Sequence, residues 1–192
     1  LGINPDIRYF NLSQNATLTL TPTAALWSGG TLYGAWYIEE GAQVRFPAGM
    51  EVPVNEAMLQ LAGSASFPAL APLHTNRRSI ELLSGHVLVT AGNLLNTDGG
   101  QITLGEGAGL QLGPLGTGAL TLAEGTSMSL SGGSGIHGNV VHAGWVTVGY
   151  HPSLDPLPPS PTIRGNLEMA PAAVLTVIGR KIGGAIDSLP LL

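Results

Sequence analysis

The chain has 192 residues, of which 44% are hydrophobic, only 10% are charged and 28 are glycine. It is too hydrophobic for a disordered chain and too rich in glycine and proline for a helix bundle, which leaves an all-β protein with many turns. The net charge of −5 without a basic stripe argues against nucleic-acid binding, and the lack of cysteine excludes disulfides and thiolate zinc sites.

The N-terminal part already contains a short strand–turn–strand pattern. Residues 11–27 hold two overlapping copies, and residues 38–46 (IEEGAQVRF) are a third. Alternation of apolar and polar residues with a period of two predicts half-buried strands. The Glu-Gly-Ala segment predicts a turn, because glycine adopts a positive φ without steric cost and glutamate stays hydrated.

The pattern loosens over residues 46–61 and lapses over residues 62–79 (AGSASFPALAPLHTNRRS). Pro68 and Pro72 cannot donate hydrogen bonds to a strand neighbour, so this segment is predicted to be a loop that leaves the stack. The alternation returns at residues 80–82 and 87–89 and continues to residue 104.

The clearest repeat spans residues 99–130. Leu104, Glu106 and Gly107 match Leu122, Glu124 and Gly125 at an offset of 18 positions (122 minus 104). Strand pairs this short are unstable alone, so the repeats are predicted to stack.

The C-terminal part continues the same spacing. A glycine-rich turn at residues 131–139 precedes Val146, which lies 18 positions beyond Met128 (146 minus 128). Residues 150–161 hold five prolines and are predicted to be a second loop, after which Ile163 to Val177 return to the core. We therefore predict one all-β domain over residues 1–192, a right-handed parallel β-helix (β-solenoid) with rungs of about 18–20 residues. Because the chain starts with Leu1, it is expected to be a fragment or processed form of a longer chain.

The last third also resembles a known kind of sequence. Residues 138–153 (GNVVHAGWVTVGYHPS) and 161–177 (PTIRGNLEMAPAAVLTV) resemble bacterial autotransporter-like and PEP-CTERM-associated surface proteins, in which a Gly/Asn strand and a Gly-x-Ser-Pro-Gly turn precede T-I-x-G-N-L-x-L-x-P-G-A-x-L. His142 departs from this pattern, as do the turn at residues 150–153 and the inserted residues 154–159. The resemblance implies an exported β-solenoid that serves as a stalk, adhesin or matrix element, and it implies no catalytic residues.

Two sets of side chains are candidates for catalysis or metal binding. Glu39, Glu40, Glu106 and Glu124 could be acid/base carboxylates of a polysaccharide-cleaving β-helix, but their turn positions favour solvated residues. The five histidines (His74, His86, His137, His142 and His151) lack the spacing of a metal site, since His137 and His142 fall on opposite faces unless a turn intervenes. No catalytic residue, metal or other cofactor is predicted.

The aromatic residues are the candidate binding residues. Tyr33, Trp36 and Tyr37 lie close together in sequence, and Trp145 and Tyr150 flank a later strand. Aromatic rings on a flat β face can stack on sugars or contact a partner. The alternative is that they cap the N-terminal end of the stack or contact another subunit, and this alternative is favoured for the first cluster.

These features predict a secreted, cell-surface structural or adhesive protein without enzyme activity, a β-solenoid stalk or a fibre (filament) subunit that assembles end to end. The expected partners are further copies, the rest of a longer chain, or a surface glycan. No nucleic-acid partner and no membrane span are expected. The alternative function is a carbohydrate-binding or polysaccharide-depolymerising β-helix of the tailspike-like kind.

Overall fold

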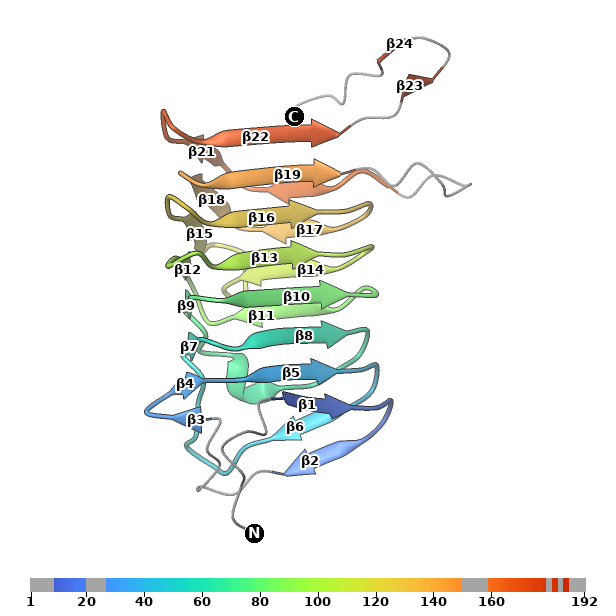
Figure 1. Cartoon of the computed structure of the whole chain (residues 1–192), viewed down its shortest axis with the longest axis vertical. Coiled ribbons are helices and arrows are strands. Elements are labelled where there is room, and N and C mark those ends of the chain that lie inside the picture. The colour runs from blue at the N-terminus through green and yellow to red at the C-terminus, as the bar shows by residue number, and fades with distance from the viewer. Residues whose placement is uncertain (1–8, 20–26, 150–158, 179–180, 183–184, 187–192) are drawn as a thin grey trace.

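The computed structural model describes residues 9–19, 27–149 and 159–178, together with two short strands at 181–182 and 185–186. The chain winds into a β-solenoid of about six turns, which confirms the predicted fold class. In Figure 1 the front strands run to the right and the chain returns behind them as it rises from the N-terminus to the C-terminus, so the coil is right-handed. From residue 79 onward, each complete turn, or rung, contributes one strand to each of three sheets.

Sheet 1 is the front sheet of Figure 1, and its neighbouring strands are parallel. Its order is β1 (Tyr9–Leu12), β5 (Ala35–Ile38), β8 (Met58–Ala62), β10 (Ser79–Leu83), β13 (Gln101–Leu104), β16 (Ser127–Leu130), β19 (Trp145–Gly149) and β22 (Val174–Ile178).

Sheet 2 follows sheet 1 along the chain. It is formed by β11 (Val87–Thr90), β14 (Gly109–Leu112), β17 (Gly135–His137) and β20 (Thr162–Arg164), again in parallel. Nearer the N-terminus, β2 (Thr17–Thr19) and β6 (Gln43–Arg45) form a separate parallel pair.

Sheet 3 completes each rung and leads back to sheet 1. Its order is β21 (Leu167–Met169), β18 (Asn139–His142), β15 (Ala119–Leu122), β12 (Leu94–Asn96), β9 (Thr75–Asn76), β7 (Val54–Asn55), β4 (Thr31–Leu32) and β3 (Trp27–Ser28). β3 pairs antiparallel with β4, and so do β23 (Lys181–Ile182) and β24 (Ala185–Ile186) with each other.

The alternation in the sequence becomes stacked columns of apolar side chains inside the coil. On sheet 1 the register places Ile80 beside Ile102, Ile102 beside Met128 and Met128 beside Val146, and all four are buried. Burial of such a side chain contributes roughly 1.5–3 kcal/mol relative to leaving it exposed. Because a rung is only one strand thick on each side, several stacked rungs are needed for this contribution to exceed the entropy cost.

The corners confirm the predicted Glu-Gly-Ala turn. The Ala108 N–H donates to Gly105 O at 3.1 Å, and the Ala42 N–H donates to Glu39 O at 3.0 Å. Gly107 and Gly41, each at the third position of its turn, have φ of 66° and 73°. These values lie in the region that a type II turn requires and that glycine adopts without strain. The alanine that follows each glycine is buried and returns the chain to the core.

The predicted rung length of 18–20 residues is wrong for most of the coil. Trp145 pairs with Ser127 at an offset of 18 (145 minus 127), but Ser127 pairs with Gln101 at 26 (127 minus 101) and Val174 with Trp145 at 29 (174 minus 145). The 18-residue repeat relates different sides of the coil, since Leu104 lies in sheet 1 and Leu122 in sheet 3. All three sides use the same strand–turn chemistry, so similar sequences recur before a rung is complete.

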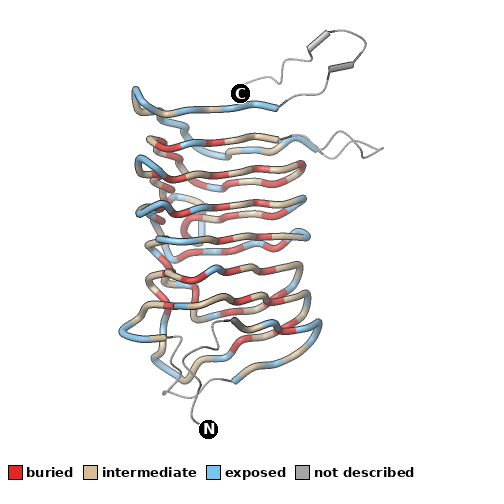
Figure 2. The backbone as a smooth tube through the Cα atoms, in the orientation of Figure 1, coloured by how far each residue is buried: buried red, intermediate tan, exposed pale blue. Residues whose placement is uncertain are grey.

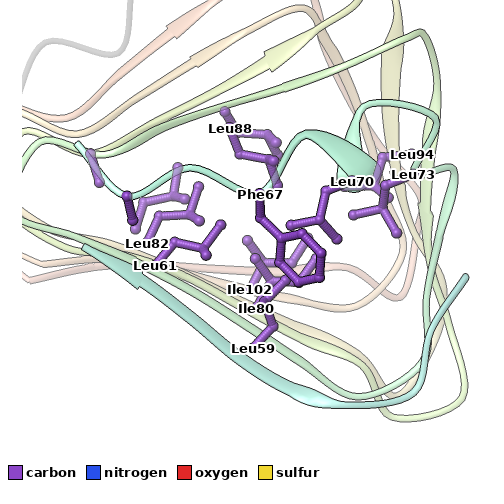
Figure 3. Packing of buried hydrophobic residues seen from close by; sticks show 14 of the residues in the cluster. Leu59, Leu61, Phe67, Leu70, Leu73, Ile80, Leu82, Leu88, Leu94 and Ile102 are labelled. Atoms are coloured by element: carbon purple, nitrogen blue, oxygen red, sulfur yellow. The ribbon is translucent and has the colours of Figure 1, made fainter. Parts of the chain in front are cut away.

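Residues 62–79 do not leave the stack as predicted. Phe67, Leu70 and Leu73 are buried in the core, and the 3-10 helix η1 (Pro68–Leu70) takes the place of a strand on one side of its rung. Figure 3 shows these side chains packed against leucines and isoleucines of the neighbouring rungs. The prolines remove strand hydrogen bonds, but the apolar residues between them still fill the interior. Of the second predicted loop, residues 150–158 lie outside the described part of the chain.

Candidate functional site

Trp36, the centre of the predicted aromatic platform, lies inside the coil. Its side chain is 0% exposed, and its Nε1–H donates to Tyr33 O at 2.8 Å. Its ring packs against Phe10 and Phe67 at centroid distances of 4.7 and 5.6 Å, and Phe46 lies 6.4 Å away. A binding platform that includes Trp36 is therefore wrong. Trp36, Phe10 and Phe67 pack together in the N-terminal rungs. Capping of the stack or subunit contact by the Tyr33, Trp36 and Tyr37 cluster stays a prediction.

The structure separates the other predicted aromatic residues. Tyr33 is 37% exposed and Tyr37 is half-buried on the outer face of β5. Trp145 is on β19, which four strands of sheet 1 separate from β5. Tyr150 lies outside the described residues. The five predicted residues therefore do not form one site, and Trp145 has to be considered alone.

Trp145 is 67% exposed and projects outward from sheet 1. Strand β19 pairs on one side with β16 and on the other with β22. The backbone N–H of Trp145 donates to Thr126 O at 2.9 Å. The indole thus stands on a backbone that is held from both sides. A large apolar side chain in such a setting contributes little to the core, so its exposure is the strongest surface signal among the predicted residues.

The candidate carboxylates do not converge. Glu106 lies at the corner between sheets 1 and 2, and Glu40 lies at the corner between β5 and β6. Glu124 lies at the corner between sheets 3 and 1. All three are exposed, in keeping with hydrated turn residues. A glycosidase needs two carboxylates on either side of one bond, which these positions do not provide.

The histidines also stand apart. His74 and His137 are exposed, His86 and His142 are buried in different rungs, and His151 lies outside the described residues. Within the described part of the chain no three His, Cys, Asp or Glu side chains are grouped so that they could hold a metal ion.

A polar column inside the coil was missed by the sequence analysis. Asn55, Asn76 and Asn96 occupy successive strands of sheet 3 and are completely buried. The Asn55 Nδ2 group donates to Asn76 Oδ1 at 2.7 Å, and the Asn76 Nδ2 group donates to Asn96 Oδ1 at 2.6 Å. We call this column the asparagine ladder. Its sequence signal is the spacing of 21 and then 20 residues, close to a full rung.

The ladder joins each rung to the next at the corner between sheets 3 and 1. Asn55 Nδ2 also donates to Ser79 O, and Asn76 Nδ2 to Gln101 O, at 3.1 and 3.2 Å. Ser79 and Gln101 are the first residues of the sheet 1 strands one rung above. Gly100 is required beside Asn96, because a Cβ there would lie 2.3 Å from Asn96 Oδ1.

His142 continues this column after an interruption. The register runs from Asn96 to Leu122 and then to His142, so the leucine breaks the amide chain. His142 Nε2 lies 3.0 Å from Val174 O, and Val174 is the first residue of the next sheet 1 strand. Since a carbonyl only accepts, Nε2 carries the proton and makes the same rung-to-rung contact as Asn55 and Asn76. The opposite atom, Nδ1, is buried and has no hydrogen-bond partner among the described residues.

Comparison with known proteins does not place this arrangement in a family. No protein-family profile, no curated protein and no solved structure matches the chain. The 3-10 helix η1 has only three residues. Among the described residues, no helix has the length and the apolar character that a membrane span needs.

Proposed function

We propose that the chain is a structural β-solenoid of an exported bacterial surface protein, and that it assembles end to end through its C-terminal rung. The family resemblance of residues 138–192 supports an extracellular role of the stalk, adhesin or fibre kind. The C-terminal rung supplies the physical reason for assembly.

The observation that carries the proposal is the exposure of core positions in that rung. Leu167 pairs with Val140 and Met169 pairs with His142, both of which are 0% exposed one rung below. Leu167 and Met169 are nevertheless 42% and 44% exposed. Figure 2 shows the change from buried to exposed colours between the middle rungs and the last one. Side chains that face the interior elsewhere thus lie uncovered at this end.

The unpaired strand edges at the C-terminal rung also support assembly. Within the described residues, β20, β21 and β22 each end their sheet and pair on one side only. An uncovered row of N–H and C=O groups above apolar side chains favours the addition of another strand layer. A further rung would satisfy both the backbone groups and the apolar surface.

The N-terminal rungs differ from this end. Aromatic rings close the interior around Trp36, and β3 ends sheet 3 with an antiparallel pair instead of a parallel edge. Assembly is therefore expected to depend on the C-terminal rung more than on the N-terminal one.

Concentration-dependent light scattering and negative-stain electron microscopy test the proposal. We expect association of the full chain as concentration rises, and Met169→Lys should abolish it because a lysine cannot be buried in the joint. Val89→Lys, at an outward position of sheet 2 that is exposed to a similar degree, is the matched control and should associate normally. Rods of one length at every concentration would refute end-to-end assembly, and equal association of Met169→Lys would place the contact elsewhere.

A further inference from the structure

The types of the outward-facing residues of sheet 1 change along the coil. In the register, one outward column runs through Gln101, Ser127, Trp145 and Val174. The next runs through Thr103, Ser129, Thr147 and Thr176. We call these two columns on β13, β16, β19 and β22 the upper outer face. It carries hydroxyl, amide and apolar groups and no charged side chain.

Backbone pairing with β16 and β22 holds the face on both sides of Trp145. Neighbouring strands lie about 4.8 Å apart, and residues two apart on one strand are about 7 Å apart on the same face. Ser127, Ser129 and Thr147 therefore lie within reach of a ring stacked on the indole. Since Ser127, Ser129 and Thr147 are short, the indole of Trp145 stands above its neighbours.

From this arrangement we propose that the upper outer face binds a neutral, β-1,4-linked polysaccharide, with one sugar ring stacked on Trp145. A pyranose ring presents C–H groups on its faces, which pack on an aromatic ring, and hydroxyls around its edge. The hydroxyls of Ser127, Ser129 and Thr147 can donate to and accept from these groups. A β-1,4-linked chain is extended, as the strands are, and the face has no cationic side chain to pair with an anionic polymer.

The site is independent of end-to-end assembly, because it lies on the side of the coil. The proposed structural role needs no ligand, and this site adds a polysaccharide ligand to it. Lower on the same sheet, Glu81 replaces the hydroxyl in the second column, which marks the lower limit of the uncharged surface.

Titration of the full chain with cellohexaose and chitohexaose, followed by calorimetry and tryptophan fluorescence, tests the proposal. Of the three tryptophans, Trp36 is buried, Trp27 is partly buried against the core and Trp145 is 67% exposed, so a change in the exposed emission reports mainly on Trp145. We expect binding of at least one hexasaccharide and little weakening in high salt, since no ion pair is involved.

Matched variants locate the site. Trp145→Ala should weaken binding at least about tenfold, as loss of a central aromatic contact does, and Thr147→Val about threefold. Trp145→Phe should retain binding and guards against misfolding of the alanine variant. Thr121→Val, an outward threonine on sheet 3, is the control for Thr147→Val and should bind normally.

Three results would overturn the proposal. These are no binding of either hexasaccharide by the folded chain, equal affinity of Trp145→Ala and the parent chain, or loss of binding in high salt. The first two would leave end-to-end assembly unaffected, so the failure of one proposal is distinguishable from the failure of the other.

Discussion

The rungs that contain the asparagine ladder and the rungs above it differ at one interior column. Below, Asn55, Asn76 and Asn96 are linked by amide hydrogen bonds that cross from rung to rung. Above, the same column contains Leu122, His142 and Met169. In this column the upper rungs have one side-chain contact, between His142 and Val174 O, in addition to backbone pairing and apolar packing. We infer that local opening begins at the C-terminal rungs, because fewer buried interactions oppose it.

The largest loss of stability is expected when a charged side chain is placed in the interior of the coil. Leu122→Asp and Leu112→Asp should each destabilise the fold by about 5 kcal/mol or more, because they remove a fully buried side chain and bury a carboxylate without a partner. Chemical denaturation and hydrogen exchange should show neighbouring rungs unfolding together. Leu115→Asp, at a loop position that is 79% exposed, is the control. Unchanged melting of the interior variants would contradict their place in the solenoid.

The ladder itself is tested by Asn76→Leu. This change removes the amide bonds to Asn55 and Asn96 and leaves buried polar groups unsatisfied, so we expect a loss of about 3 kcal/mol. Denaturation midpoints measure the loss. Asn93→Leu is a useful control because its exposed side chain makes a single bond, from the Ala119 N–H. A loss no larger than that of the control would mean that the ladder contributes little.

A smaller and more local effect is expected at His142. His142→Leu leaves Val174 O without its donor and should cost about 1–2 kcal/mol. Hydrogen exchange should accelerate in β22 before it does in β10. His142→Asn restores a side-chain N–H, as at Asn55 and Asn76, and should recover part of the protection. Uniform acceleration along the whole coil would contradict a local role.

The smallest expected effect is the pH dependence due to His86. Burial lowers the pKa of His86 below its ordinary value of 6.5, although its hydrogen bond with Gly63 O opposes this shift. The unfolded chain therefore takes up the proton first as the pH falls. Stability should be highest above pH 6.5, decline as the pH falls from there through the folded-state pKa, and change no further below it.

Comparison with His86→Ala isolates this contribution. Alanine fits the turn position, as Ala108 does in the next rung, and the variant should lose part of the decline in stability below pH 6.5. Denaturation midpoints measured across this range provide the check. An identical pH profile for the variant and the parent chain would exclude His86 as the source.

The candidate sites show how far sequence reasoning reached. The turn carboxylates Glu40, Glu106 and Glu124 are exposed, as their residue type and turn position indicate. Trp36 was placed wrongly because aromatic clustering in sequence does not reveal which side of a strand faces inward. The asparagine ladder was missed because its members lie 21 and 20 residues apart, and the 18-residue repeat behind the predicted rung length does not align them.

Most strands, the Glu-Gly-Ala turns and the solenoid class can be predicted from the sequence alone, because alternation and glycine position are local properties of the chain. Which strands are neighbours becomes known only from the folded structure. Residues 113–118 form a loop between β14 and β15, whereas Gly138 alone joins β17 to β18, so rungs of different length keep the same backbone register. Register depends on hydrogen bonds between distant segments. The same register aligns the three asparagines and places Leu167 and Met169 in the C-terminal rung, where they lie uncovered.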